Sequence, residues 1–481
     1  MLVNNLNKLS LNISTFIVEW LRGRSDFKSR SFYGETFSLA LLQRTSLLNK
    51  DLHAKLVKSY TSIDKVDSQF HWEFNNYALL DYYKNSNDET IKEFFEPLKF
   101  KNTQVTNWTL LRSATRLMAK KDESHAINEA KNKINKFQLT SGLILDQKTD
   151  KSFQYHCFSM AMIGEIYQHT QDKYFKVSFL KGVDFIRNFI LSNGDTLYIG
   201  RGQNQSFGYG ALIYILAFAY KLTNDKTLLG DIEKVSNFLQ KYQIEDGSFP
   251  LVMNRVEVSI PRVVDMKKEE FIGWYPYNNY FDYLPFMGLF ISKANEILEI
   301  LDTSNIEYRK RECYNNKDFS KIIKPNYEAI ISKSGGYWTN DMPMPYIVSK
   351  GSNITPCYGG EQFQKSLYSL EGLPLPYCNK LKKSIRWKSI SFLKGVRLWI
   401  ISPLGIMKRE FIFRNDCIDI STKVFSIFTF RHIYLFLNNN KNILDNMERF
   451  TFDGYEYSAS GKLKKYIDKN KISNIRLKIE S

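Results

Sequence analysis

The chain has 481 residues, too many for one ordinary domain, and this length favours two or three domains. Apolar residues make up 43% of the chain and charged residues 24%, a globular composition that excludes wholesale disorder. The longest unbroken apolar run, residues 211–220, is about half as long as a membrane-spanning helix needs to be. We therefore expect no integral membrane segment.

The net charge of +17 points to an anionic partner, although a solvated basic surface is the simpler interpretation. Nucleic acid, a membrane surface and an acidic polysaccharide are the candidate partners. Lysines are spread over the whole chain, most densely over residues 462–478, without zinc-finger spacing, an RNP-like run or a helix-turn-helix pattern. We therefore expect an acidic polysaccharide or oligosaccharide as the partner, and no nucleic acid.

The five cysteines are widely spaced and include no CxxC pair, which predicts neither a disulfide framework nor a structural metal. Reduced, buried thiols are typical of a reducing compartment. Residues 1–24 carry apolar residues broken by Asn and Ser, a pattern typical of an amphipathic helix rather than a signal peptide. These features predict a cytoplasmic protein, and nothing in the sequence indicates its oligomeric state.

Apolar residues recur at helical spacing through the first 300 or so residues. The predicted helices cover residues 36–49, 76–84, 107–121, 124–137, 153–169, 173–191, 206–222, 227–242 and 279–302. Turn signals separate them, and the alternation of helix, short loop and helix indicates antiparallel pairs that pack against their neighbours. We predict an incomplete (α/α) toroid over residues 1–302.

The pattern changes after residue 303, where polar, Lys- and Asn-rich residues 303–325 predict a linker. Short β-rich runs follow at residues 328–334, 345–350, 396–402, 409–414, 417–430 and 432–437. Residues 450–457 predict a hairpin around Asp453-Gly454. The expected fold class is α+β, multidomain, with an antiparallel β-sandwich over residues 326–481.

No P-loop, HExxH motif, nucleophile elbow or kinase signature is present, so no cofactor is predicted. The candidate chemistry lies instead in four clusters at loop–helix junctions. The first contains His71, Trp72 and the pair Asn75-Asn76. His71 and Asn75 share a helix face, where an imidazole and an amide can receive a carboxylate or move a proton. An ordinary helix N-cap explains the same residues.

The second cluster is Asp150-Lys151-Ser152-Phe153-Gln154-Tyr155-His156. Ser152 is a candidate helix cap, and Tyr155 and His156 are either buried core residues or lie at the rim of a cavity. The third cluster, residues 194–210, has five glycines together with Arg201, Gln203, Gln205 and Tyr209. Glycine lets the backbone approach a ligand closely, and such planar donors suit sugar hydroxyls and carboxylates.

The fourth cluster, residues 273–283, crowds aromatic residues around Asn279 and Tyr280. Aromatic crowding is typical of a hydrophobic core, and beside amides it also suits the face of a sugar.

The second and third clusters resemble the heparinase II/III-like and alginate-lyase-like group of polysaccharide lyases. In that group an acidic residue, a Ser and a Tyr-His pair open a toroid helix, as in Asp150, Ser152 and Tyr155-His156. The run Tyr198-Ile199-Gly200-Arg201 resembles a loop of the same group, and Asn75-Asn76 its Asn-rich helix start. The resemblance implies a toroid followed by a β-sandwich and a lyase-like activity in bacterial surface-polysaccharide metabolism.

Such a lyase neutralises the C5 carboxylate of a uronic acid, removes the C5 proton and protonates the leaving O4. We assign binding of the carboxylate to Asn76 and Arg201, and proton transfer to His156 and Tyr209. Arg201 and Tyr209 lie in one loop and are a candidate pair in which the arginine lowers the pKa of the tyrosine, although their spacing alone does not establish contact. The residues assigned to substrate binding are polar and aromatic members of the clusters: His71, Trp72, Tyr155, Gln203, Gln205, Asn279 and Tyr280. No metal ligands are assigned.

Three alternatives remain open at this point. A uronate epimerase uses the same proton abstraction and returns the proton to the other face. An (α/α)-type glycoside hydrolase needs two carboxylates, for which Asp195 and Asp246 are candidates. A non-catalytic carbohydrate-binding or assembly factor is favoured by the C-terminal part, which has a single histidine, His432, where the lyase group has a His/Asp set.

Overall fold

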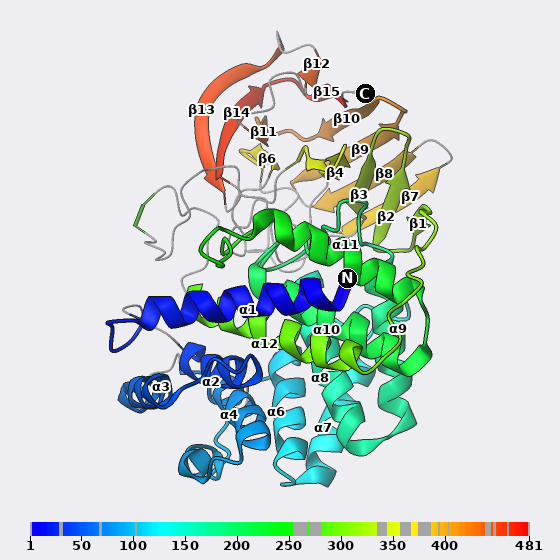
Figure 1. Ribbon diagram of the computed structural model, residues 1–481. Coiled ribbons are helices and arrows are strands. Elements are labelled where there is room, and N and C mark those ends of the chain that lie inside the picture. The colour runs from blue at the N-terminus through cyan, green and yellow to red at the C-terminus, as the bar shows by residue number, and fades with distance from the viewer. Residues whose placement is uncertain are drawn as a thin grey trace.

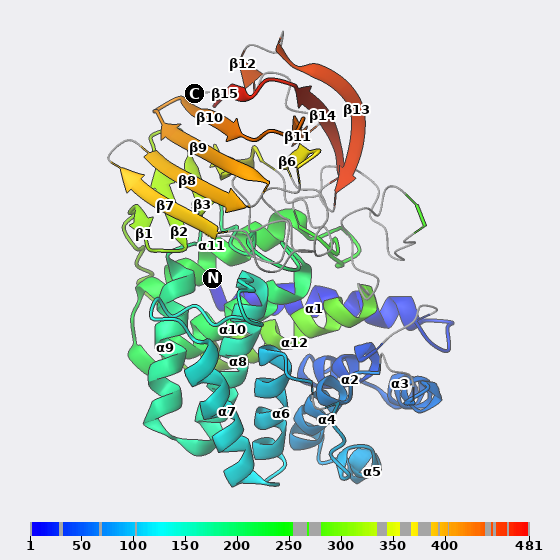
Figure 2. The ribbon, with the colours of Figure 1, turned by 180° about the vertical axis from the view of Figure 1, so that it is seen from behind.

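A computed structural model describes residues 2–27, 32–66, 70–101, 103–253, 267–268, 280–333, 344–355, 367–373, 386–392, 395–402, 404–437, 444–445, 449–458 and 461–479. Its described residues up to Glu299 are mainly helical, and those from Tyr314 onward form antiparallel sheets stacked on one end of the helical part (Figures 1 and 2). The predicted α+β class is therefore confirmed.

Six of the described helices form the inner layer of the helical part, and the other described helices lie outside them. The inner helices are α2 (Gly34–Arg44), α4 (Trp72–Ser86), α6 (Thr106–Met118), α8 (Phe153–Thr170), α10 (Ser206–Thr223) and α12 (Tyr280–Glu299). The others are α1 (Leu2–Leu21), α3 (Lys50–Ser62), η1 (Glu89–Ile91), α5 (Lys92–Phe95), α7 (Glu123–Phe137), α9 (Lys173–Arg187) and α11 (Thr227–Tyr242).

Each inner helix contacts the next, and α12 closes the ring by packing on both α10 and α2. Each outer helix packs on an inner helix that is its neighbour in sequence, except that α1 pairs with α12. The outer layer is thinnest between α4 and α6, where it is reduced to η1 and α5. This is the (α/α) toroid predicted from helical spacing.

Three inner helices end in the same way, with a residue of left-handed backbone conformation. Asn87 after α4, Gln171 after α8 and Asn224 after α10 have φ of 53°, 52° and 56°. At each of them the backbone N–H returns to the carbonyl four residues earlier and completes the last turn. At the other end of α8, the Ser152 hydroxyl accepts from the Tyr155 N–H, as its predicted capping role requires.

The described strands form three antiparallel sheets. The first has the order β1 (Tyr314–Asn315), β2 (Phe319–Ile323), β3 (Glu328–Ser332), β4 (Tyr346–Ser349), β5 (Ser352–Asn353). The second has the order β12 (Leu444–Asp445), β15 (Ile472–Lys478), β10 (Cys417–Phe425), β9 (Gly405–Phe413), β8 (Gly395–Ser402), β7 (Arg386–Phe392). The third has the order β13 (Thr451–Ser458), β14 (Gly461–Asp468), β11 (Arg431–Leu437), β6 (Tyr368–Glu371).

The first sheet joins the helical core to the sandwich core. Phe319, Ile330 and Val348 belong to the helical core, whereas Ile331 and Ile347 belong to the apolar cluster shared with the other two sheets. Successive side chains of a strand point to opposite faces, so alternate residues of one sheet serve both cores.

Two sequence predictions about this half of the chain are wrong in part. The predicted linker, 303–325, contains β1 and β2, and Phe319 in β2 is fully buried against the helices. The predicted turn at Asp453-Gly454 lies inside β13, where the register shifts between Phe452 and Tyr455 and Gly454 has φ of 84°. This glycine allows a bulge rather than a turn.

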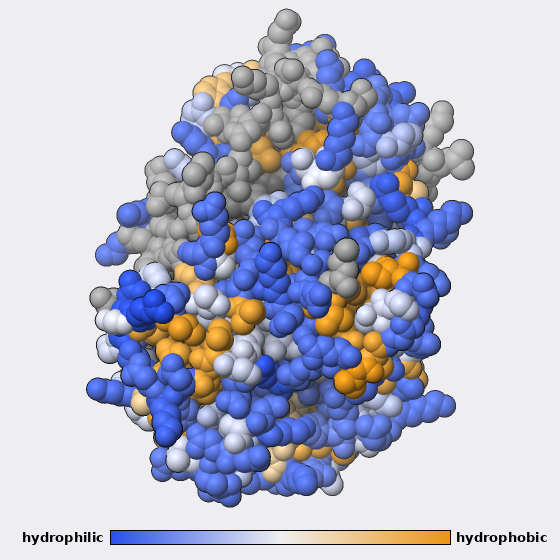
Figure 3. Space-filling view, in the orientation of Figure 1, coloured by the Kyte–Doolittle hydropathy of each residue, from blue (hydrophilic) through white to orange (hydrophobic). Residues whose placement is uncertain are grey.

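The molecular surface is largely hydrophilic in the face drawn in Figure 3, with apolar patches over the helical part. Over the described ranges, no helix combines the length and the apolar character that crossing a bilayer requires.

Candidate functional site

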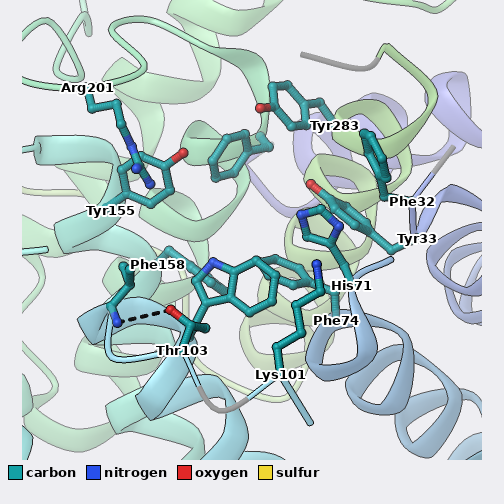
Figure 4. Close-up of a pocket in the computed structure, with 13 residues that line it drawn as sticks. Phe32, Tyr33, His71, Phe74, Lys101, Thr103, Tyr155, Phe158, Arg201 and Tyr283 are labelled. Carbon is teal, nitrogen blue, oxygen red and sulfur yellow. Dashed lines mark hydrogen bonds between the residues drawn. The ribbon is translucent and has the colours of Figure 1, made fainter. Parts of the chain in front are cut away.

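A pocket lies where the six inner helices begin. Its volume is about 300 Å³, and each inner helix, or the segment that leads into it, contributes to the lining. The lining residues, shown in Figure 4, are Phe32, Tyr33, His71, Phe74, Lys101, Thr103, Val105, Trp108, Tyr155, Phe158, Arg201, Phe207 and Tyr283. Because the N-terminus of a helix carries a partial positive charge, this end of the ring favours an anion.

His71 stands at the start of α4 among aromatic rings. Its ring centroid lies 4.9 Å from those of Phe32 and Trp108 and 5.6 Å from that of Tyr33. The buried Asn75 amide fixes the backbone here by donating to the carbonyls of Phe32 and His71. Packing against these rings and the hydrogen bonds of Asn75 therefore hold the imidazole at the pocket wall.

Arg201 and Tyr155 form a stacked pair on another wall of the pocket. The guanidinium carbon of Arg201 lies 4.1 Å from the Tyr155 ring centroid, and its Nη2 atom lies 3.2 Å from Oδ2 of Asp146. Asp146 is fully buried, and burial raises the pKa of its carboxyl group while the charge of Arg201 counteracts that rise. Asn107 donates to the other carboxylate oxygen of Asp146. Arg201 therefore has a fixed orientation.

The loop that carries Arg201 approaches the start of α8 closely. The Ser152 hydroxyl donates to the Arg201 carbonyl at 2.8 Å, which ties the loop to the cap of the helix that bears Tyr155. Gly200 has φ of +86°, and a Cβ atom there would lie 1.9 Å from the Lys151 carbonyl oxygen. Only glycine fits this position without movement of the backbone.

We expect Gly200→Ala to destabilise the protein and displace Arg201. Gly351→Ala is a matched control, since Gly351 has φ of +75° but no atom near its missing Cβ. Gly351→Ala should lose only the strain energy of an alanine in a left-handed backbone conformation, about 1–2 kcal/mol. Gly200→Ala has the same strain and in addition a clash with a backbone oxygen. Denaturant unfolding of both variants checks this, and equal losses of unfolding free energy would contradict it.

Lys101 is the second cation of the pocket, and no sequence pattern marked it. Its backbone N–H donates at 2.8 Å to Oε1 of Glu73, a fully buried side chain in the first turn of α4. Burial lowers the pKa of the Lys101 ammonium group, and the nearby Glu73 carboxylate opposes that effect. The ammonium lies 5.6 Å from the ring centroid of Trp108. Glu73 therefore anchors the segment that presents Lys101.

Of the residues predicted from sequence, the structure brings His71, Tyr155 and Arg201 together in the pocket. Asn76 is instead buried one residue beyond Asn75, and its amide donates to the Lys99 carbonyl. The side chain of Trp72 packs on Phe70 beneath the Lys99 ammonium. Neither Asn76 nor Trp72 is among the described residues that line the pocket.

His156 does not line the pocket, and of its two predicted environments, the core and a cavity rim, the structure has it in the core. It is fully buried, Nδ1 accepts from the Ile144 N–H at 3.1 Å, and Nε2 donates to the Gly182 carbonyl at 3.0 Å. Burial lowers its pKa to about 4, although the bond to Gly182 opposes this shift. Both ring nitrogens are occupied, which leaves no site for a substrate proton.

The buried His156 predicts a loss of stability in mild acid. The unfolded histidine has a pKa of about 6.5, so the unfolded state gains a proton first as pH falls, and stability is complete only above this value. As the pH falls from the pKa of the unfolded histidine to about 4, the free energy of unfolding decreases by on the order of 3 kcal/mol. Urea unfolding at neutral and mildly acidic pH measures it. The His156→Gln variant should be less stable than the wild type at neutral pH but should lose less unfolding free energy on acidification. An equal loss in both proteins would contradict the attribution of the acid sensitivity to His156.

Tyr209 belongs to a buried network and is not among the described residues that line the pocket. The Tyr209 hydroxyl donates to Asp195 Oδ1 at 2.7 Å, and Asn204 donates to the same oxygen. Tyr346 of β4 donates to the other oxygen of Asp195. This network joins the glycine-rich loop to the first sheet.

The remaining predicted residues also lie away from the pocket or outside the described ranges. Gln203 donates to the Tyr198 carbonyl, and Gln205 is hydrogen-bonded to the Gln154 amide. Tyr280 is buried against Phe16 at the start of α12. Asn279 lies outside the described residues. The glycine-rich loop is therefore largely a structural element that presents Arg201.

The described lining of the pocket carries two cations and no carboxylate. Aromatic rings surround Lys101 and Arg201, and the hydroxyls of Tyr33, Tyr155 and Tyr283 are drawn in Figure 4. The chemistry of this lining suits a small anion that also has hydrophobic or sugar faces. Within the ranges that the structure describes, no cluster of three or more His, Cys, Asp or Glu side chains is arranged to hold a metal ion.

No protein-family model and no curated protein matches the sequence. Similar solved structures include a heparan sulfate lyase from Pedobacter heparinus, with 11% identity and a TM-score of 0.48 over 93% of this chain and 75% of that one. An unsaturated glucuronyl hydrolase specific for heparin has 12% identity and a TM-score of 0.45 over 63% and 100%. A family 88 glycosyl hydrolase from Bacteroides vulgatus has 15% identity and a TM-score of 0.44 over 62% and 99%.

Proposed function

We propose that the pocket binds an acidic sugar and that the protein is a polysaccharide-lyase-like enzyme acting on a uronic-acid-containing glycan. The observation that carries the proposal is the meeting of Lys101, Arg201, His71 and Tyr155 around one cavity at six helix N-termini. Two cations match a carboxylate, and the aromatic rings match the apolar face of a pyranose.

In the proposed reaction, Arg201 and Lys101 hold the C5 carboxylate and stabilise the negative charge that develops on it when the C5 proton leaves. The His71 imidazole takes that proton. The electron pair of the C5–H bond forms the C4–C5 double bond, the C4–O4 bond breaks, and the Tyr155 phenol protonates the departing O4. Figure 4 shows His71 and Tyr155 on opposite sides of the cavity, which suits one group as base and the other as acid.

These roles revise the assignments made from sequence. Lys101 replaces Asn76 at the carboxylate. His71 and Tyr155 replace His156 and Tyr209 in proton transfer. Each replacement lines the pocket, and the residues they replace are not among its described lining. Arg201 keeps its assigned role at the substrate carboxylate. A part in bacterial surface-polysaccharide metabolism stays a prediction from the sequence resemblance.

The hydrolase alternative requires two carboxylates at the cleaved bond. Asp195 is buried and accepts from Asn204 and Tyr209, and Asp246 accepts from the Ser248 N–H in a tight turn. Neither lies among the described lining residues of the pocket. The geometry therefore favours elimination or epimerisation over hydrolysis.

Ultraviolet absorbance and isotope exchange separate the remaining possibilities. Elimination creates a double bond conjugated to the C5 carboxylate, and ultraviolet absorbance should rise as uronate polymers are cleaved. Epimerisation leaves absorbance unchanged but brings solvent deuterium to C5. A protein that binds uronate oligosaccharides and produces neither signal is a non-catalytic binding factor, and that result would overturn the enzymatic part of the proposal.

A further inference from the structure

One end of the sandwich exposes an apolar row on the outer face of the six-stranded sheet. Ile401 pairs with Ile406, and Ile406 pairs with Phe425, so that the three side chains lie side by side across β8, β9 and β10. Their exposed fractions are 50%, 38% and 58%. Isolated exposed apolar residues are ordinary, but a contiguous row at the end of a sheet is characteristic of a binding surface.

The loop after β10 extends the row beyond the sheet. Ile427 is 95% exposed and Phe428 is 47% exposed. The loop is held in place, because the Ser426 hydroxyl donates to the Leu404 carbonyl at 2.7 Å and accepts from the Phe428 N–H. We call Ile401, Ile406, Phe425, Ile427 and Phe428 together the sandwich tip.

Exposed lysines lie next to the sandwich tip. Lys423 pairs with Ile472 across β10 and β15, and the Val424 N–H donates to the Lys471 carbonyl at 3.1 Å. Lys469, at the same turn, is also exposed. The neighbouring Asp468 is buried and accepts from Asn470. The sandwich tip is therefore apolar at its centre and positively charged at its border.

We propose that the sandwich tip docks the protein peripherally on an anionic membrane surface. Ile427 and Phe428 enter the interfacial layer, while Lys423, Lys469 and Lys471 contact lipid phosphate groups. A protruding, almost fully exposed side chain such as Ile427 needs a matching recess in a protein partner, but enters a bilayer without one. The net charge of +17 favours the same partner. This proposal does not depend on the proposed function of the pocket.

The test is co-sedimentation of the full chain with phosphatidylcholine vesicles that contain about 30% phosphatidylserine, or none. The wild type should bind the anionic vesicles, bind neutral vesicles at least about tenfold more weakly, and lose affinity as salt rises. Ile427→Ser/Phe428→Ser should lower the affinity for anionic vesicles at least about tenfold. Val66→Ser is the matched control, since Val66 is equally exposed, at 93%, but lies in the helical part.

Thermal unfolding of the variants establishes that the fold is intact, which is expected for exposed positions. Lys423→Glu/Lys471→Glu should abolish the preference for anionic vesicles. Failure of the wild type to bind either kind of vesicle would overturn the proposal, as would equal binding by the Ile427→Ser/Phe428→Ser variant. A self-associated form that disappears in this variant, without vesicle binding, would instead make the sandwich tip an interface between copies of the chain.

Discussion

Arg201→Gln should reduce the proposed elimination activity by about a thousandfold. Removing one preorganised group that stabilises developing charge typically costs a hundred- to a thousandfold in rate, and Arg201 also supports Tyr155 by stacking on its ring. The variant keeps a hydrogen-bonding side chain but no charge. Initial rates from ultraviolet absorbance of the product measure the effect, with Arg309→Gln as a control at a partly exposed ion pair.

The loss in Arg201→Gln must be separated from damage to the fold. Asp146 is fully buried beside Arg201, so removing the cation leaves a buried carboxylate without its counter-charge. The double variant Arg201→Gln/Asp146→Asn removes this charge and should recover stability without recovering activity. Activity close to that of the wild type in either variant would contradict the role of Arg201.

Lys293→Met should destabilise the protein by about 3–5 kcal/mol, the usual cost of breaking a buried ion pair. The Lys293 ammonium lies inside the helical ring, donates to Glu165 and lies 3.4 Å from Asp81. Burial alone lowers the pKa of Lys293, but the two carboxylates outweigh it and raise the pKa above its ordinary value. Denaturant unfolding measures the loss.

Two further variants serve as controls for Lys293→Met. Lys226→Met removes an ion pair with the exposed Asp302 and should cost less than about 1 kcal/mol. Lys293→Met/Glu165→Gln also removes the buried Glu165 carboxylate, which Lys293→Met leaves without its counter-charge, and it should recover part of the unfolding free energy that Lys293→Met loses. A loss from Lys293→Met as small as that from Lys226→Met would show that the buried cluster does not hold the ring together.

The sequence was sufficient to predict the helical ring and about half of the described strands, whereas β6, β7, β14 and β15 were not predicted. Apolar periodicity placed α8, α10 and α11 within a residue or two at each end, because these helices are buried along one face or all around. The same method missed α3 and placed a linker where β2 packs on the helices. Lys- and Asn-rich residues 303–325 have the composition of a loop, yet in β2 the polar Ser320 and Lys321 are buried beside Phe319.

The site was predictable only as far as its location. His71, Tyr155 and Arg201 each precede or open an inner helix, and the polar clusters at these junctions lie at the end of the ring that holds the pocket. Neighbouring residues on a helix point about 100° apart, so Tyr155 faces the pocket while His156 faces the outer helices. Lys101 has no local motif, because Glu73, which anchors it, lies 28 residues away in sequence.

The most direct test of the pocket is binding of the wild type and of Lys101→Ala/Arg201→Gln to an array of acidic and neutral glycans. The wild type should bind uronate-containing glycans and leave neutral glycans of the same size unbound, and the double variant should bind neither group. Equal binding of neutral and acidic glycans by the wild type, or unchanged binding of acidic glycans by the variant, would contradict an acidic-sugar site at this end of the ring.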